Sequence, residues 1–208
     1  MDIIYHDAEI IVINKPGGLL AVPGRGPEKA DCAAARLRRL FPAMIAQPAV
    51  HRLDMFTSGL MVFAMTTKAH RSLSQSFAER RVGKGYTAVV QGLLAENSGE
   101  IRLPFRLDPA NRPRQIYDVQ HGKMGITLWQ KITFQGTDTR IALTPLTGRT
   151  HQLRVHAAHP LGLAAPIVGD SLYGSGREGD QMLLHASFLR FSHPEDCTLL
   201  EFTSVPPF

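Results

Sequence analysis

One stretch of the sequence constrains the fold more than any other. It is a polar segment, His51–Gly59, that runs without a break into an apolar segment, Leu60–Met65. A short apolar run bounded by turn-forming residues predicts a buried β-strand. The polar segment holds Arg52 and Asp54 two positions apart. The sequence therefore predicts a loop that places the Asp54 carboxylate at the edge of a hydrophobic core, where neighbouring groups can control its charge.

The rest of the chain alternates short strands with few helices. Strands are predicted over residues 9–14, 60–66, 86–91, 126–134, 140–144, 183–191 and 198–203. Helices are predicted over residues 31–41, 68–81 and 150–159. The stretch 96–125, rich in Pro, Gly, Asn and Arg, is interpreted as a loop or a surface-lying insertion. Hairpin-linked strands with few helices favour an α+β fold, a largely antiparallel mixed sheet flanked by a few helices.

Length and composition are those of a globular protein that can bury a real core. We expect a single domain over 1–208. A net charge of +5 permits nucleic-acid binding without requiring it. The two cysteines, Cys32 and Cys197, are isolated and fit a reducing compartment. With neither a signal peptide nor an apolar run of membrane-spanning length, the chain is expected to be cytoplasmic and free of membranes.

A second distinctive segment is Thr147–His156, which places Arg149 and Arg154 around the first turns of a predicted helix. Cations at a helix N-terminus oppose the helix dipole, so they do not stabilise the helix there. An external anion explains them better, either a carboxylate across the core or the phosphates of a ligand. The alternative is that Arg154 is an ordinary solvated helix residue.

Three other positions also have plain structural interpretations. Asp54 is of a type common in turns, where its carboxylate can accept N–H groups from Phe56 and Thr57. Tyr86, at a strand start, can be a half-buried core residue. The Leu183–Ala186 segment can be an ordinary buried strand.

Taken together, these segments resemble the ordered motif set of the RluA-type pseudouridine synthases. HRLDMFTSG, KGYTAVVQG, TGRTHQLRVH and LLHA follow one another in the family's order. The resemblance extends over nearly the whole chain and implies the pseudouridine synthase fold. Asn111–Gln115 and Gly122–Lys123 are similar to the small members of the family, which lack an S4 RNA-binding module. The resemblance therefore implies a single catalytic domain over 1–208 with no appended RNA-binding module.

The resemblance implies roles for individual residues. Asp54 would be the catalytic carboxylate, acting on C1′ of the target nucleotide or abstracting a sugar proton. Arg154 would pair with Asp54 and keep it ionised, and Tyr86 would lie against the uracil ring. Arg52 would occupy the gap left by the extruded base. The remaining expected substrate contacts are His51, Arg149, Leu183, Leu184, Arg112 and Arg114.

The implied reaction is site-specific isomerisation of uridine to pseudouridine in structured RNA, with base flipping and an essential aspartate. The RNA would be a 23S rRNA hairpin, a tRNA stem-loop, or both. No cofactor is needed, and the family default is a monomer. One carboxylate in an apolar pocket suits this chemistry better than glycoside hydrolysis, which uses two.

Parts of the sequence also suggest two other classes of function. His151, His156 and His159 suggest a metal site, but their spacing matches no zinc motif and no carboxylate lies among them, so no metal is predicted. An RNA-binding protein without catalytic activity could keep this fold. Such a protein would be free to lose Asp54, Tyr86 or Arg154, and all three are present.

Overall fold

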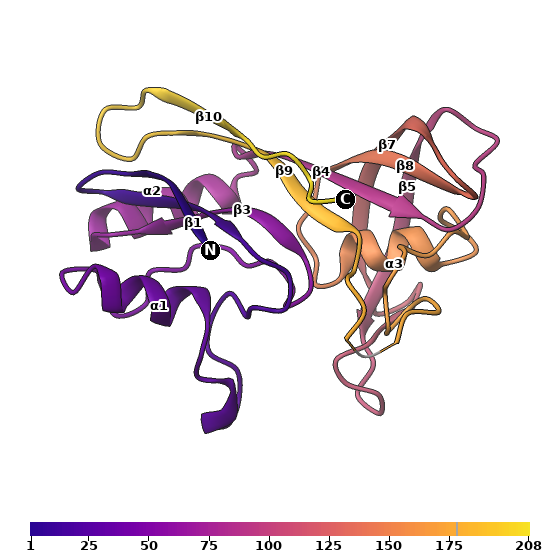
Figure 1. Ribbon diagram of the computed structural model, residues 1–208, viewed down its shortest axis with the longest axis horizontal. Coiled ribbons are helices and arrows are strands. Elements are labelled where there is room, and N and C mark those ends of the chain that lie inside the picture. Colours follow the sequence, from indigo (N-terminus) through magenta and orange to yellow (C-terminus); the bar gives the residue numbers. More distant parts are fainter. Residues whose placement is uncertain (178) are drawn as a thin grey trace. The chain divides into compact units, whose positions relative to one another are not determined.

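The computed structural model describes residues 1–177 and 179–208, which divide into two compact units (Figure 1). The first unit comprises residues 1–84 and 185–208, and the second comprises residues 85–184. The described residues form ten strands, three α-helices and one 3₁₀ turn, η1 (Pro27–Lys29). Among these residues, no helix combines the length and the apolar character needed to span a membrane.

The first unit is built on a mixed sheet. Its strands, in spatial order, are β1 (Asp2–His6), β2 (Ile10–Lys15), β3 (Ser58–Ala64), β9 (Leu184–Ser192) and β10 (Leu199–Thr203). Neighbouring strands are antiparallel except for β3 and β9, which run parallel where Ser58 and Gly59 face His185 and Ala186. All of β3 is buried, as its apolar run predicts.

Two helices belong to this unit, α1 (Ala33–Leu40) and α2 (Thr67–Ala78). The sequence predicts that Thr67 caps helix α2, but the cap is one residue earlier, where the Thr66 hydroxyl accepts the N–H of Ala69 at 3.0 Å. The inner face of α2 contributes Ala69 and Leu73 to a core with strand residues Ile10, Val12, Leu60 and Val62. In α1, the sequence predicts that Leu37 and Leu40 lie inside; Leu37 is buried, but Leu40 is 62% exposed, so the prediction for Leu40 is wrong.

The second unit contains an antiparallel sheet. Its strands, in spatial order, are β4 (Gly83–Val90), β8 (Asp138–Pro145), β7 (Lys123–Gln135), β5 (Ser98–Leu107) and β6 (Gln115–Tyr117). The short helix α3 (Gln152–Ala158) lies beside β7 (Figure 1). The predicted hairpin is confirmed, and Gly136 at its turn has φ 63°.

The predicted loop over 96–125 is wrong, because most of it forms β5, β6 and the start of β7. Ile101, Leu103 and Phe105 alternate inward along β5 and are almost fully buried. Arg102 and Pro104 stand between them, so the alternation of apolar residues typical of a strand is not visible in the overall composition of the segment. Pairing with β7 along eight residue positions holds the strand in place. The fold class itself is confirmed as mixed and mostly antiparallel.

Candidate active site

The loop that carries Asp54 ends in a tight turn directly before β3. The Thr57 N–H donates to the Asp54 main-chain carbonyl at 3.1 Å, so this N–H caps the backbone and not the carboxylate. Leu53 is buried, Asp54 is half-buried and Arg52 is exposed. An Asp next to a buried Leu and an exposed Arg fits the predicted position of a carboxylate at the edge of a core.

A buried lysine lies beneath this loop. The Lys15 ammonium is fully buried and donates to the carbonyls of Pro16, Leu19 and Met55 at 2.9, 2.8 and 3.1 Å. Burial lowers the pKa of Lys15 to about 8, and the nearby charge of Asp54 acts against that shift. The ammonium has three N–H groups and each has an acceptor, so it fixes two backbone segments beside Asp54.

In the sequence, the Lys15–Gly18 segment indicates only a turn, and no role is assigned to Lys15. The position of this lysine directly after an apolar strand was the available signal, because a lysine that becomes buried there needs its own set of hydrogen-bond acceptors. What the sequence could not supply was the third acceptor, which comes from Met55, forty positions away.

His51 holds the other end of the loop. Its Nε2 accepts the N–H of Val62 at 3.1 Å, and its ring stacks on Phe77 of α2 with centroids 4.5 Å apart. Burial, and secondarily the charge of Lys84, lowers the pKa of His51 to about 3, so its ring is neutral at pH 7. The ring therefore anchors the segment that carries Arg52 and Asp54.

The start of β3 is tied to β9 by a buried hydrogen-bond chain. Ser58 Oγ lies 2.8 Å from His185 Nδ1, and His185 Nε2 lies 3.0 Å from Ser204 Oγ. Burial lowers the pKa of His185 to about 4. Gly59, with φ 111°, faces the backbone of Ala186 so closely that a Cβ would overlap it. The loop therefore ends against a rigid pair of strands.

A cavity of about 670 Å³ lies in the first unit, next to Met55 of the loop that carries Asp54. Its wall includes Pro16–Leu20 and Met55, the backbone segments that Lys15 holds together. Charged groups of both signs line the rest of it: Glu28, Lys29, Asp31 and Arg36. Asp31 and Arg36 neutralise one another in a two-bond ion pair.

In the second unit, the central observation concerns Arg154 on α3. Its side chain is almost fully buried and forms a two-bond ion pair with Asp170, Nε to Oδ2 and Nη2 to Oδ1, both 2.7 Å. Burial alone would raise the pKa of Asp170, but the hydrogen bonds and charge of Arg154 hold that pKa below its usual value. The anion predicted for this arginine is thus partly supplied from within the unit.

Asp170 is a residue that sequence reasoning missed. In the sequence, the neighbours of Asp170 in Val168–Ser171 indicate only a turn. The structure contains this turn, in which Asp170 Oδ1 also accepts the N–H groups of Leu172 and Tyr173 at 2.8 and 3.1 Å. The predicted pairing of Arg154 with Asp54 stays a prediction.

Tyr173 joins this pair to the rest of the second unit. Its ring centroid lies 5.2 Å from the Arg154 guanidinium and 5.9 Å from that of Arg114. Its hydroxyl is hydrogen-bonded to His151 Nδ1 at 2.8 Å and to the Gln115 N–H at 2.7 Å. The sequence predicts a tight turn at Gly148 at the entry to α3, but the residue in the left-handed conformation there is His151, with φ 55°.

The other predicted site residues fall in varied settings. Tyr86 is half-buried on β4, Leu184 is buried and Leu183 is half-buried, with backbone bonds to Val89 and Val168. Arg149 and Arg112 are exposed. Arg114 is exposed too, but its guanidinium donates to the Leu172 carbonyl.

The three histidines considered for a metal make separate contacts. His151 bonds Tyr173, His156 packs edge-on against Phe105, and His159 lies over Tyr117. With no metal expected, the sequence predicts that His151 and His156 are hydrogen-bonded structural residues, and this prediction is confirmed only for His151. Neither ring nitrogen of His156 has a hydrogen-bond partner among the described residues.

Comparison with known proteins gives a consistent result. A family model described as "RNA pseudouridylate synthase" matches residues 9–159. "Dual-specificity RNA pseudouridine synthase RluA" of Pasteurella multocida is 42% identical over 100% of this chain and 94% of its own length. The Yersinia pestis protein of the same name is 43% identical over 100% of both chains. The solved structure "Human RNA Pseudouridylate Synthase Domain Containing 1" matches with a TM-score of 0.78 and 31% identity, over 100% of this chain and 84% of that one.

Proposed function

The chain belongs to the family of RNA pseudouridylate synthases, and from this membership we propose that Asp54, Tyr86 and Arg154 carry its reaction on a uridine in an RNA stem-loop. The reaction class comes with the family: the enzyme isomerises uridine to pseudouridine, and its substrate is RNA.

The observation that carries the assignment of Asp54 is the buried Lys15 ammonium, whose pKa is raised by the charge of Asp54 against the effect of burial. The ammonium donates to three carbonyls, one of them that of Met55, the residue directly after Asp54. The loop that carries Asp54 is held further by the bond from the Thr57 N–H to the Asp54 carbonyl. An ionised carboxylate is what either route requires, whether attack on C1′ or removal of a sugar proton.

The bond changes of the isomerisation balance without any co-reactant. The N1–C1′ bond breaks, the uracil turns, and a C5–C1′ bond forms, while C5 loses a proton and N1 gains one. Tyr86 would lie against the uracil ring during this rotation, with Leu183 and Leu184 as apolar walls that keep water out. Arg154 would hold its charge opposite Asp54.

Base flipping assigns a role to Arg52. Extracting a base from a stacked helix costs a few kcal/mol, and a basic side chain that fills the gap can offset this cost. Arg52 is exposed, two residues before Asp54, in a loop that His51 anchors on α2. Arg149, Arg112 and Arg114 would contact the RNA backbone, with Arg114 also bound within the protein.

The choice of RNA is a proposal as well. Similarity to relatives named as dual-specificity synthases supports more than one target, 23S rRNA and tRNA stem-loops. We further propose that the chain acts as a monomer, that residues 1–208 work as one catalytic domain, and that its place is the cytoplasm. The family match over 9–159 extends across both compact units, and the exposed thiol of Cys197 suits a reducing compartment.

The test is pseudouridine mapping on total RNA from cells that lack this protein. The cells are complemented with the wild type or with Asp54→Asn. We expect a set of uridines modified only with the wild type, which would name the substrates. Restoration of the same marks by Asp54→Asn would remove Asp54 from its proposed role.

A further inference from the structure

Arg154 is hydrogen-bonded to Asp170, a residue to which the proposed function assigns no role. Its Nε and Nη2 groups are both bonded to Asp170, so one edge of the guanidinium plane is occupied by a carboxylate of the same unit. A two-bond arginine–carboxylate pair fixes the plane and the direction of the guanidinium, which a single bond does not. The opposite edge, which carries Nη1, is thereby aimed away from Asp170.

Asp170 is itself held in place. Its Oδ1 accepts the backbone N–H groups of Leu172 and Tyr173, and its main-chain carbonyl accepts those of Gly174 and Gly176 at 3.1 and 3.2 Å. The carboxylate therefore belongs to a closed turn and does not depend on Arg154 for its position. The direction of support runs from the turn to the arginine.

Tyr173 provides the third constraint. Its ring lies 5.2 Å from the guanidinium carbon of Arg154, within the range of a cation–π contact. The same ring is fixed by the bonds of its hydroxyl to His151, at the entry to α3, and to Gln115. Arg154 is thus oriented in the plane by Asp170 and supported on one face by Tyr173.

We propose that Asp170 is a positioning residue of the reaction, which acts by holding the Arg154 guanidinium in one orientation, with Tyr173 as its support. This inference rests on the proposed role of Arg154 in catalysis. A buried ion pair contributes little to stability compared with well-packed apolar groups, so the stability of the fold alone does not explain why Asp170 and Arg154 are charged.

The test uses single-turnover kinetics with enzyme in excess. The probe is unfractionated RNA from cells that lack this protein, tritiated at uridine C5, because C5 releases its hydrogen when pseudouridine forms. The assay separates the limiting rate from the half-saturating enzyme concentration. For Asp170→Asn we expect a limiting rate about 10- to 100-fold lower, the cost of misplacing a reacting group by about 1 Å. The half-saturating concentration should change by less than about threefold, a margin small against that loss.

Asp118 provides a matched control in the same unit. Its carboxylate also pairs with an arginine Nε, that of Arg106, and accepts two backbone N–H groups, those of Gln120 and His121. Asp118→Asn removes the same kind of contact away from Arg154, and its limiting rate should equal that of the wild type.

Asp170→Glu keeps the charge but moves the carboxylate by one methylene. If position matters, this variant is slow although its far-ultraviolet circular dichroism and unfolding midpoint match the wild type. In an Arg154→Lys background, Asp170→Asn should cause little additional loss, because the group it orients is already gone.

The outcomes separate the two proposals. If Asp54→Asn releases tritium at the wild-type rate, the proposed function fails. If Asp54→Asn is inactive but folded Asp170→Asn reacts at the wild-type rate, only the positioning role fails. If neither Asp170 variant folds, Asp170 is a structural residue and the inference is overturned.

Discussion

At the scale of single residues, two buried charges define the chemistry that the chain can offer. Lys15 in the first unit donates to three carbonyls and interacts electrostatically with Asp54, and Asp170 in the second unit forms a two-bond ion pair with Arg154. Each of these charges is costly to bury, and each is matched to a partner that the proposed reaction uses. The predicted catalytic residues therefore have partners that the motif pattern alone does not include.

The role of Lys15 is tested by Lys15→Met. Removing the ammonium leaves three carbonyls, of which that of Leu19 is buried, without the donor they share, which should lower the free energy of unfolding by about 2 kcal/mol. It also removes a positive charge beside Asp54, so the limiting rate should fall more than folding explains. Urea titration and single-turnover assays measure the two effects separately.

Lys131 is the control for this experiment. Its ammonium also donates to two carbonyls, those of Leu94 and Ala95, but it lies in the second unit on β7. Lys131→Met should cost some stability and leave the limiting rate unchanged. An equal loss of rate in both variants would contradict a specific role for Lys15.

RNA contacts are tested best at Arg112. Charge reversal of Arg112 and Arg114 together should weaken RNA binding, but Arg114 also donates to Leu172 and lies over Tyr173. Arg112→Glu alone should weaken binding and reduce the slope of log K against log salt by about one phosphate contact, or ~0.7–0.9. Filter binding across a salt series measures this slope, and an unchanged slope would remove Arg112 from the interface.

At the scale of elements, the parallel contact between β3 and β9 fixes where the loop that carries Asp54 ends. Gly59 stands at this contact because any side chain would overlap Ala186. The sequence predicted both strands to within two residues, since their apolar runs are local signals. It did not reveal β1, β5 or β6 as strands, because their short or mixed patterns become strands only through pairing with a neighbour.

Gly59→Ala is expected to be strongly destabilising. The substitution adds both a positive-φ penalty and a steric overlap with β9. Gly92→Ala is the control, because Gly92 has φ 84° and an added Cβ there would meet nothing within 4 Å. The control should cost about 1 kcal/mol and Gly59→Ala about 2–3 kcal/mol more. Equal losses in urea unfolding would mean that the strands can separate to accept the methyl group.

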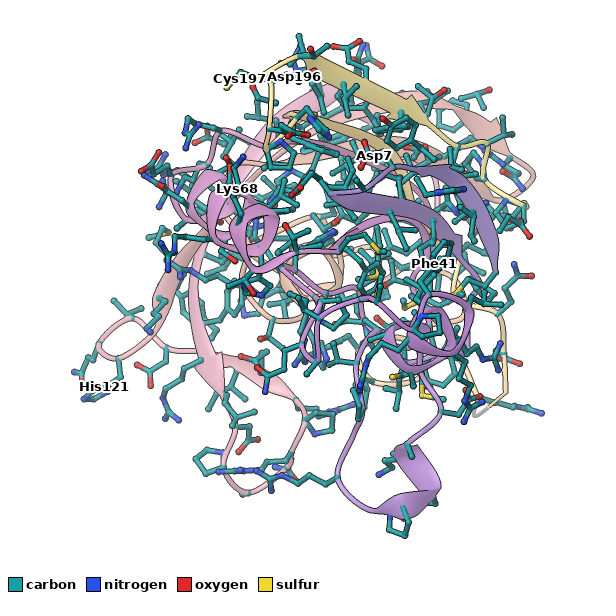
Figure 2. The ribbon with its side chains drawn as sticks, turned by 90° about the vertical axis from the view of Figure 1, so that its left-hand side faces the viewer. Asp7, Phe41, Lys68, His121, Asp196 and Cys197 are labelled. Atoms are coloured by element: carbon teal, nitrogen blue, oxygen red, sulfur yellow. The ribbon has the colours of Figure 1, made fainter. Side chains whose placement is uncertain are left out.

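At the scale of the whole molecule, three histidines make stability depend on pH: His156 and His185, which are buried, and His51, which is half-buried. The pKa is lowered from 6.5 to about 3 for His51, to about 4 for His156 and to about 4 for His185, in each case mainly by burial. Other ionisable side chains are exposed to solvent. Figure 2 shows two of them, Lys68 on α2 and His121 in the loop before β7, projecting outward.

Acid should therefore begin to destabilise the protein below pH 6.5, before most carboxylates titrate. Since the folded pKa of each histidine lies below its unfolded value, the stabilisation is complete above pH 6.5. It is lost as the pH falls from 6.5 through the folded values, about 4 for His156 and His185 and about 3 for His51, because the unfolded chain takes up more protons in this range. Each neutral histidine contributes a slope of about 1.4 kcal/mol per pH unit. Urea titrations between pH 7.5 and 4.5 measure the sum.

His156→Leu should reduce this slope by one histidine. Because neither ring nitrogen has a hydrogen-bond partner among the described residues, the substitution removes no such bond at neutral pH. The exposed His121 is the control, and His121→Gln should leave the slope as it is in the wild type. A slope that survives His156→Leu in full would show that His156 is protonated within the fold.

The sequence by itself determined the reaction class through the resemblance of its motifs to a known family. It also determined the loop that carries Asp54 and most strands, because turn residues and apolar periodicity are local properties of the chain. Only the tertiary structure decided how the charges are partnered. The Met55 carbonyl accepts from Lys15, forty positions away, and Asp170 accepts from Arg154, sixteen positions away. No local sequence pattern predicts either contact. The physical reason is that a buried charge is stabilised by whichever groups the fold brings to it.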